Sequence, residues 1–410
     1  MELLNKIFRG DKIVWVIFIL LILISIVEVF SAASTLTYGK EDYWGPIRGH
    51  SSNLMLGFLV VYIAHLIPYR FYKAIPVALV PVSVGMLIYV LAKGEITNAA
   101  QRWINLGFIS IQPSELAKVG VIMGTALLLS RLQKEDGARE DAMKWILIMT
   151  GIVCALIVSE NLSTAVLLFG VVYLMMYVGR VPKRQMRILT LTIVGLGALF
   201  ISTLLIVPKS TLEEIKGLKR LTTWQGRVER FFEKPAPIPA ERFVFTAENY
   251  QESHAKMALV SSNFIGRGPG NSVERDYLPQ AFSDFIFAII IEELGFAGGA
   301  FVVMLYIILL IRAAKIAQRC RSYFPAFLVM GCALMLVAQA MLNMMVAVGL
   351  FPVTGQPLPL ISRGGTSAII TCGYIGMILS VSYYTEKAEQ EQMTAVEQTE
   401  SDIPEILREE

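Results

Sequence analysis

The chain has 410 residues, of which 55% are hydrophobic and only 17% are charged. Soluble domains carry nearer a quarter of charged residues, and the apolar residues here lie in long blocks, so the composition excludes a set of ordinary soluble domains and indicates a membrane protein. The net charge is +3, and four cysteines without a CxxC pair together with three histidines argue against a zinc site or a disulfide framework.

Apolar runs long enough to cross a bilayer recur along the chain. The first, from Val14 to Ala33, is too long for the apolar part of a cleavable signal peptide and is interpreted as a permanent helix. We expect an all-α integral membrane protein with about ten transmembrane helices, in which residues 1–385 form a single membrane domain. The spans are expected near residues 14–33, 53–69, 75–92, 115–131, 144–159, 162–179, 188–207, 285–311, 324–350 and 365–384.

The orientation follows from the basic residues of the connecting segments. With the N-terminus in the cytoplasm, the inner segments hold nineteen Lys and Arg residues and the short outer loops hold five. Cytoplasmic loops carry the excess of Lys and Arg in membrane proteins. Both termini are therefore expected in the cytoplasm, and residues 208–283 are expected outside as a large extracytoplasmic loop between helices 7 and 8.

Two polar segments remain outside the predicted helices. The 208–283 loop is far longer than a connection requires, and long loops are usually functional. It contains eleven Lys and Arg and nine Asp and Glu, a balance too even to indicate a nucleic-acid partner. Its amphipathic stretches, 218–232 and 255–265, fit short helices on the membrane surface. Residues 386–410 are acidic and lack apolar periodicity, which predicts a disordered cytoplasmic tail, with a docking peptide as the alternative.

The first polar block at membrane depth runs from Ala100 to Lys118. Glu115 and Lys118 lie three residues apart just after Pro113, so they share one helix face and can pair. The pair is either a structural ion pair or part of a substrate site, and the spacing leaves both open. Arg102, near the outer surface, can either bind an anionic headgroup through its forked guanidinium or extend to the interface as an ordinary basic residue.

The second block begins at Tyr277 and ends at Gly295. Asp284 is expected where the outer loop leads into the eighth helix, with Glu292 and Glu293 more than two turns deeper. A carboxylate at that place either stabilises the helix dipole or takes a proton from an attacking hydroxyl group.

The third block, residues 352–367, is rich in proline and glycine and cannot form a regular helix. Irregular backbone at membrane depth is tolerated only against protein or a water-filled cavity. The segment is therefore either a rigid re-entrant turn or a place where glycines let a ligand approach closely.

These blocks carry a family resemblance. From Lys12 to about Tyr384 the chain resembles the SEDS family of bacterial cell-wall proteins, which includes FtsW, RodA and SpoVE, and the stretch Arg227–Phe232 ahead of Tyr250 is similar to the division branch, FtsW. The matching motifs are Gln101-Arg102-Trp103-Ile104, Gln112-Pro113-Ser114-Glu115 with Lys118, Tyr277-Leu278-Pro279, Asp284-Phe285-Ile286-Phe287, Glu292-Glu293-Leu294-Gly295, and Thr354-Gly355-Gln356-Pro357-Leu358-Pro359 with Ser362, Gly364 and Gly365.

The resemblance implies a peptidoglycan glycosyltransferase of the inner membrane, at the division septum, that polymerises lipid II on the outer face. It implies Asp284 as the catalytic base, and a class B penicillin-binding transpeptidase and other division proteins as partners. Arg102 or a divalent cation, Mg²⁺ or Mn²⁺, would stabilise the pyrophosphate, with no residue assigned to a metal. The residues expected to bind substrate or line the cavity are Arg102, Glu115, Lys118, Tyr250, Gln251, Gln280, Glu292, Ser362, Gly364 and Gly365.

The chain departs from the family pattern around the same blocks. Gln280 and Phe282 stand where a glutamate and a histidine are usual, Asn161 replaces a carboxylate and has Glu160 beside it, and Arg363 replaces a tyrosine and adds a cation. Three alternative functions stay open: a lipid II flippase, an elongation polymerase like RodA, and a scaffold that only recruits a transpeptidase. The chain has no convincing internal repeat, which a transporter commonly shows.

Overall fold

The computed structural model describes residues 8–32, 44–93, 95–97, 100–105, 110–207, 222, 224–226, 228–229, 245, 249–278 and 281–401. The long helices of these segments are α2 (Lys12–Ala32), α3 (Gly45–Leu66), α4 (Ile75–Lys93), α5 (Pro113–Arg131), α6 (Glu140–Val158), α7 (Leu162–Val178), α8 (Lys183–Ile206), α12 (Ile286–Arg319), α13 (Tyr323–Ala347) and α14 (Gly365–Ser401). Each predicted span coincides with one of them.

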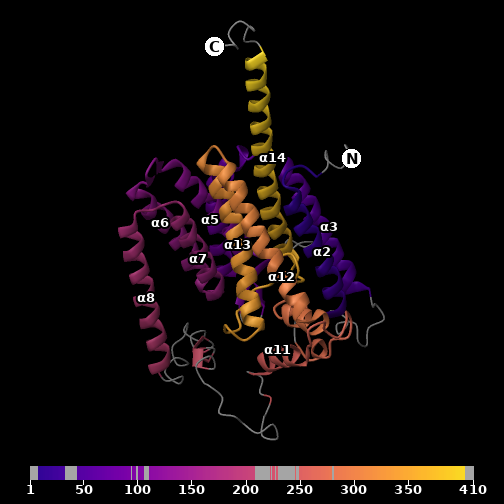
Figure 1. Ribbon diagram of the computed structural model, residues 1–410. Helices are drawn as coiled ribbons and strands as arrows, with labels where there is room; N and C mark the ends of the chain where they lie inside the picture. Colours follow the sequence, from indigo (N-terminus) through magenta and orange to yellow (C-terminus); the bar gives the residue numbers. More distant parts are fainter. Residues whose placement is uncertain are drawn as a thin grey trace.

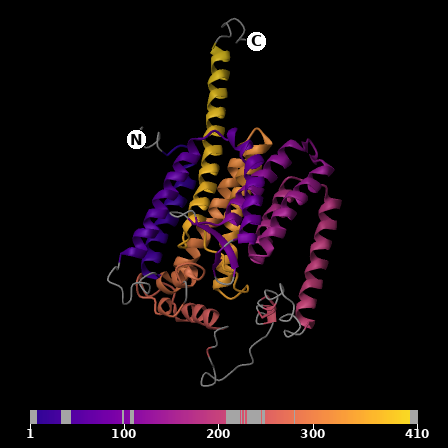
Figure 2. The same cartoon turned by 180° about the vertical axis from the view of Figure 1, so that it is seen from behind.

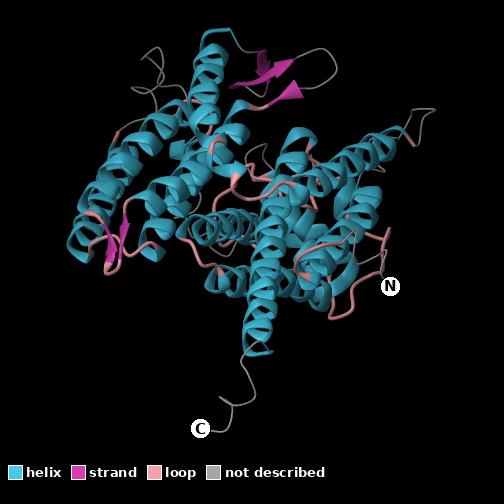
Figure 3. Ribbon diagram, turned by 90° about the horizontal axis from the view of Figure 1, so that it is seen from above, coloured by secondary structure: helices cyan, strands magenta, loops and turns pink. Residues whose placement is uncertain are grey.

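The remaining described elements are short. They are the helix α11 (Tyr250–Ser261), the 3-10 turns η2 (Phe71–Lys73) and η4 (Glu274–Asp276), the antiparallel strands β1 (Glu95–Thr97), β2 (Ala100–Asn105) and β3 (Ser110–Ile111), and the β4 (Gln133–Lys134) and β5 (Gly137–Ala138) ladder. Figure 3 shows these strands at the margins of the helices. The predicted all-α membrane fold is confirmed. Within the described segments, seven helices are long and apolar enough to cross a membrane, and α7 is a shorter apolar helix; the full count of ten stays a prediction.

The helices form one bundle, with the start of α2 and the end of α14 at the same end (Figures 1 and 2). The helix α11 lies at the opposite end, called here the α11 end. Helix α13 is central, because it contacts α5, α7, α12 and α14 and most of its side chains are buried. Helix α8 stands at the side, and only Met186 and Leu204 of it are buried. Its exposed apolar surface suits contact with lipid.

Helix α12 is bent sharply at Gly295, whose φ of +73° is a left-handed conformation that glycine adopts easily. A Cβ atom on Gly299 would lie 2.8 Å from Ile291 Cγ1 and 3.6 Å from Phe287 Cζ. Eight residues of a straight helix span about 12 Å, so such contacts require the two parts of α12 to fold against each other. The first part, 286–294, is thus a short buried helix that leads back from the bend.

The C-terminal segment differs from its prediction. Helix α14 continues beyond the bundle to Ser401, whereas a disordered tail was expected from residue 386 (Figure 1). The extension is rich in Glu, Gln and Ala, which favour helix, and Lys387 Nζ lies 3.7 Å from Glu391 Oε1, four residues later. The absence of apolar periodicity thus indicated a solvated helix rather than disorder. Residues 402–410 lie outside the described residues.

The structure describes the 208–283 loop mainly over residues 249–278, close to α12. Helix α11 covers residues 255–261 of the amphipathic stretch predicted at 255–265. The stretch predicted at 218–232 lies mostly outside the described residues, so it stays a prediction.

Candidate active site

The spacing of two serines along helix α2 gives the depth of the candidate site within the bundle. The Ser31 hydroxyl donates to the Glu293 carboxylate near the α11 end, and Ser25 Oγ donates to Ile361 O over 2.7 Å. These serines are six residues apart, or about 9 Å along the helix axis. Ile361 belongs to residues 348–364, the irregular segment between α13 and α14, called here the proline loop. The proline loop therefore reaches about 9 Å further into the bundle than Glu293 does.

The Asp284 turn, residues 281–285, meets the proline loop at this depth. Arg363 N donates to Phe282 O over 2.9 Å, and Ser362 Oγ donates to Ser283 O over 2.6 Å. The predicted order of depth is therefore wrong, because Asp284 lies deeper than Glu292 and Glu293. The bend at Gly295 is the reason, since the first part of α12 runs from the Asp284 turn back toward the α11 end.

Several polar groups of the proline loop are hydrogen-bonded within the loop or to neighbouring helices, which suits irregular backbone at membrane depth. Leu358 N donates to Ser362 Oγ over 2.7 Å, and the Tyr306 hydroxyl donates to Pro359 O. Gln356 Nε2 donates to Thr164 Oγ1 at the start of α7 over 2.8 Å. These contacts make the loop a rigid re-entrant turn. Ser362, a predicted cavity residue, is buried and fixes this turn.

Asn343 on α13 ties the Asp284 turn to the proline loop. Its Nδ2 donates to Asp284 O over 2.9 Å and to Gln356 O over 2.7 Å. The Asp284 side chain is partly exposed, and its Oδ1 accepts from Ser283 Oγ over 3.1 Å. On its other side, a Cβ atom on Gly355 would be 3.6 Å from Asp284 Oδ2. A carboxylate with a fixed backbone and an accessible side chain can accept a proton from a bound hydroxyl group.

The predicted ion pair of α5 is present and is connected to the same loop. Lys118 Nζ lies 2.8 Å from Glu115 Oε1, and the two side chains are 1% and 7% exposed. Lys118 Nζ also donates to Gln339 Oε1 over 3.1 Å, and Gln339 Nε2 donates to Pro357 O over 2.9 Å. The pair thus supports the proline loop through Gln339, and its contact with substrate stays a prediction.

Sequence reasoning passed over Gln339 and Asn343. Both are buried amides, four residues apart on α13, so they share one face of the helix. Two amide side chains in an otherwise apolar span would have been a usable signal, because polar groups at membrane depth are usually functional.

Glu292 was predicted to line the cavity, but in the structure its carboxylate is bonded to a neighbouring segment of the protein. It is fully buried, and its carboxylate accepts from Ser272 Oγ over 2.5 Å and from Val273 N over 3.0 Å, while Arg267 Nη1 lies 3.2 Å away. Glu293 likewise accepts from Gly270 N over 2.9 Å. These carboxylates hold residues 267–274 against the bend of α12, which leaves Glu292 no accessible oxygen for a substrate.

The other predicted cavity residues lie in different parts of the structure. Tyr250 and Gln251 begin α11, where the Tyr250 ring is 4.3 Å from the His254 ring, and no described contact joins them to Asp284. Gly364 and Gly365 lead into α14 beside the site, and the space around Gly365 is open. Gln280 and the side chain of Arg102 lie outside the described residues.

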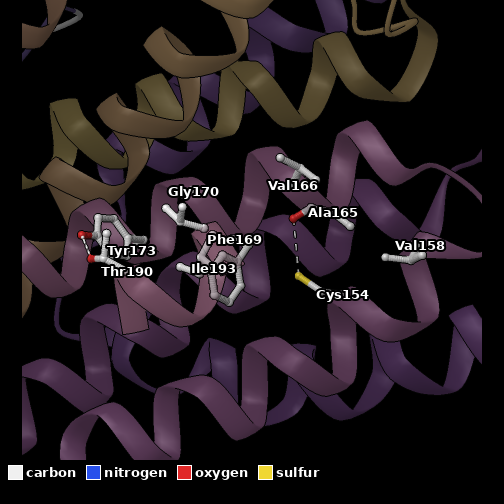
Figure 4. A pocket seen from close by; sticks show the side chains of 10 residues that line it. Cys154, Val158, Ala165, Val166, Phe169, Gly170, Tyr173, Thr190 and Ile193 are labelled. Atoms are coloured by element: carbon white, nitrogen blue, oxygen red, sulfur yellow. Dashed lines mark hydrogen bonds between the residues drawn. The ribbon is translucent and has the colours of Figure 1, made fainter. Parts of the chain in front are cut away.

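An apolar cavity of about 510 Å³ lies between α6, α7 and α8 (Figure 4). It is lined by Cys154, Val158, Ala165, Val166, Phe169, Gly170, Tyr173, Thr190, Ile193 and Val194. Its two hydroxyl groups, those of Tyr173 and Thr190, are hydrogen-bonded to each other over 2.8 Å. Ala165 lines the cavity next to Thr164, which bonds the proline loop, so the cavity adjoins the support of the site.

A family model described as "Cell cycle protein", covering FtsW, RodA and SpoVE, matches residues 11–387. The chain belongs to the FtsW/RodA/SpoVE family. The resemblance seen in the three polar blocks is thereby confirmed.

Relatives named as probable peptidoglycan glycosyltransferase FtsW cover most of the chain. The Coxiella burnetii protein is 30% identical over 382 residues, covering 91% of this chain and 96% of its own length. The Hahella chejuensis protein is also 30% identical and covers 87% of this chain and 84% of its own.

Solved structures agree in fold. A chain from a peptidoglycan synthase complex that coordinates polymerization and crosslinking aligns with a TM-score of 0.67 and 24% identity, covering 92% of this chain and 98% of that one. The rod shape determining protein RodA of Thermus thermophilus aligns with a TM-score of 0.62 and 23% identity, covering 91% and 96%.

Proposed function

We propose that this protein is a peptidoglycan glycosyltransferase that polymerises lipid II on the outer face of the inner membrane, with Asp284 as the general base. The observation that carries the proposal is the partly exposed Asp284 carboxylate, whose backbone is fixed inside the bundle by Asn343 and the proline loop. The FtsW relatives, named as glycosyltransferases, support the same reaction and favour the division branch over elongation.

The reaction joins two lipid-linked sugars. The 4-hydroxyl group of one lipid II attacks the anomeric carbon of the other, the bond from that carbon to the diphosphate oxygen breaks, and undecaprenyl diphosphate leaves. Asp284 takes the proton of the attacking hydroxyl group, a contribution that is typically about 10²–10⁴-fold in rate. In the described part of the chain no group of three His, Cys, Asp or Glu side chains could hold a Mg²⁺ or Mn²⁺ ion, so the step is assigned to the protein's own groups.

The polyprenyl chain of a substrate has a place in the apolar cavity between α6, α7 and α8. A chain of isoprene units needs only apolar contact, which the cavity walls supply. Because the proline loop is bonded to the start of α7, a lipid chain in this cavity would leave its headgroup on the side of the Asp284 turn. The peripheral position of α8 suits lateral access from the membrane (Figure 1).

The proposal includes the orientation of the protein in the membrane and its partner proteins. The excess of basic residues on one side supports a cytoplasmic location for both termini, which puts the α11 end outside, where lipid II carries its sugars. A class B penicillin-binding transpeptidase, which crosslinks the strands made here, is the proposed partner, with other division proteins at the septum.

The proposal is tested with purified protein in proteoliposomes containing labelled lipid II, with and without a class B penicillin-binding protein. Formation of glycan polymer supports the glycosyltransferase. Movement of lipid II across the bilayer without polymer would indicate a flippase. Neither polymer nor movement, with the partner present, would leave a scaffold as the remaining function.

A further inference from the structure

Arg363 is a cation near Asp284 that has no role in the proposed proton transfer. It lies in the proline loop just before α14, its side chain is half-buried, and its guanidinium carbon is 5.3 Å from the centre of the Phe282 ring. Within the described part of the chain, no carboxylate oxygen lies within 4.0 Å of this guanidinium. Arg267 and Arg312, in contrast, each pair with a carboxylate.

A charged group at this depth is costly unless it is paired. Charged side chains inside a membrane bundle almost always have a partner or mark a functional site. The Arg363 backbone is also fixed, because its N–H donates to Phe282 O over 2.9 Å, two residues before Asp284. Among the described residues, a guanidinium is therefore held beside the Asp284 turn without a carboxylate to balance it.

The groups next to Arg363 suit an anion. Helix α14 begins at Gly365, and the first N–H groups of a helix have no partner within it and form its positive end. Thr366, in this first turn, is 9% exposed, and its Oγ1 has no hydrogen-bond partner in the part of the chain that the structure describes. No heavy atom of the described residues lies within 4 Å of where a Cβ atom of Gly365 would be, so these residues leave space beside this turn.

We propose that Arg363, Thr366 and the first turn of α14 bind the diphosphate group of a polyprenyl-diphosphate lipid beside Asp284. A guanidinium can bind two phosphate oxygens at once, and a hydroxyl group and helix N–H groups can donate to the others. The identity of the lipid rests on the proposed function, whereas the anion site rests on these residues alone. The diphosphate belongs either to intact lipid II or to the leaving undecaprenyl diphosphate.

The test measures binding without turnover. Purified Asp284→Asn protein is titrated with lipid II, with undecaprenyl diphosphate and with inorganic pyrophosphate, alone and combined with Arg363→Gln, Arg363→Lys or Thr366→Val. Removing a hydrogen bond to a charged group lowers the binding affinity about tenfold or more. We expect Arg363→Gln and Thr366→Val each to weaken the binding of both lipids about tenfold or more, and Arg363→Lys to weaken it less.

The matched control is Lys256→Gln, which removes a cation of α11 that is paired with Glu252 and 53% exposed. It should leave all three dissociation constants unchanged. A loss shared by lipid II and undecaprenyl diphosphate assigns the site to the diphosphate that both carry, whereas a loss confined to lipid II would place Arg363 on the sugar part and contradict the diphosphate site. Gel filtration reports folding, and Arg363→Lys and Thr366→Val carry the test if Arg363→Gln does not fold.

Unchanged binding of both lipids in folded Arg363→Gln and Thr366→Val proteins would overturn the inference. This failure is distinct from failure of the proposed function. A parent protein that binds diphosphate through Arg363 but makes no glycan would refute only the glycosyltransferase, and one that makes glycan with Arg363-independent binding would refute only this site.

Discussion

Replacing Lys118 by methionine tests whether the buried ion pair supports the site. The substitution keeps most of the volume but leaves the Glu115 carboxylate, 7% exposed, without its 2.8 Å partner, and it removes the hydrogen bond to Gln339. Loss of one member of a buried pair costs about 3–5 kcal/mol, because the other charge stays buried and uncompensated. We therefore expect Lys118→Met to lower the free energy of unfolding by about this amount.

The matched comparison is the exposed pair Glu252–Lys256 on α11, whose side chains are 40% and 53% exposed and whose atoms are 2.6 Å apart. Exposed pairs contribute about 0–1 kcal/mol, so Lys256→Met should be nearly neutral. The double variant Glu115→Gln/Lys118→Met removes both charges and should recover much of the loss. The assay is denaturant unfolding in detergent, with lipid II polymerisation measured in parallel. A Lys118→Met protein with the stability and activity of the parent would refute the reasoning.

Three further predictions follow from the structure. Asn343→Leu removes the donor to Asp284 O and Gln356 O, so the maximal polymerisation rate should fall at least about tenfold with little change in the lipid II concentration for half-maximal rate; a parental rate would contradict it. Gly295→Ala should destabilise the protein by at least about 1 kcal/mol in denaturant unfolding, because alanine at φ +73° is strained; unchanged stability would contradict the bend. Gly217→Cys should react with an impermeant thiol reagent in spheroplasts, and a cysteine at Asp136, an exposed residue of the turn between α5 and α6, should not; the reverse labelling would overturn the orientation.

The helices and the ion pair were predictable because their signals are local. Apolar blocks of about twenty residues indicate spans directly. The three-residue spacing of Glu115 and Lys118 places them on one face, and the structure has them paired. The extension of α14 carries a local signal too, its content of helix-forming residues, which the search for apolar periodicity did not use.

The folding back of α12 could not be predicted from its own residues. A glycine after Glu292-Glu293-Leu294 also fits an uninterrupted helix, since a single glycine within a helical pattern is tolerated. The bend depends on residues 262–276, which pack on it and supply donors to both glutamates. Two of these contacts join segments about twenty residues apart through the backbone N–H groups of Gly270 and Val273, and any sequence carries such groups. Only the structure could therefore show how deep Asp284 lies and which residues the Glu292 carboxylate contacts.

Polymerisation of lipid II by Asp284→Asn protein tests the central claim most directly. Asparagine keeps the size of the side chain and can still accept from Ser283, and the bonds from Asn343 and Ser362 are made to backbone atoms that the substitution leaves in place. The variant should therefore fold, insert and bind lipid II as the parent does. The account predicts that it makes at least about 10²-fold less glycan in proteoliposomes, because an amide cannot accept the proton of the attacking hydroxyl group. Polymerisation within a few-fold of the parent would contradict the assignment of Asp284 as the catalytic base.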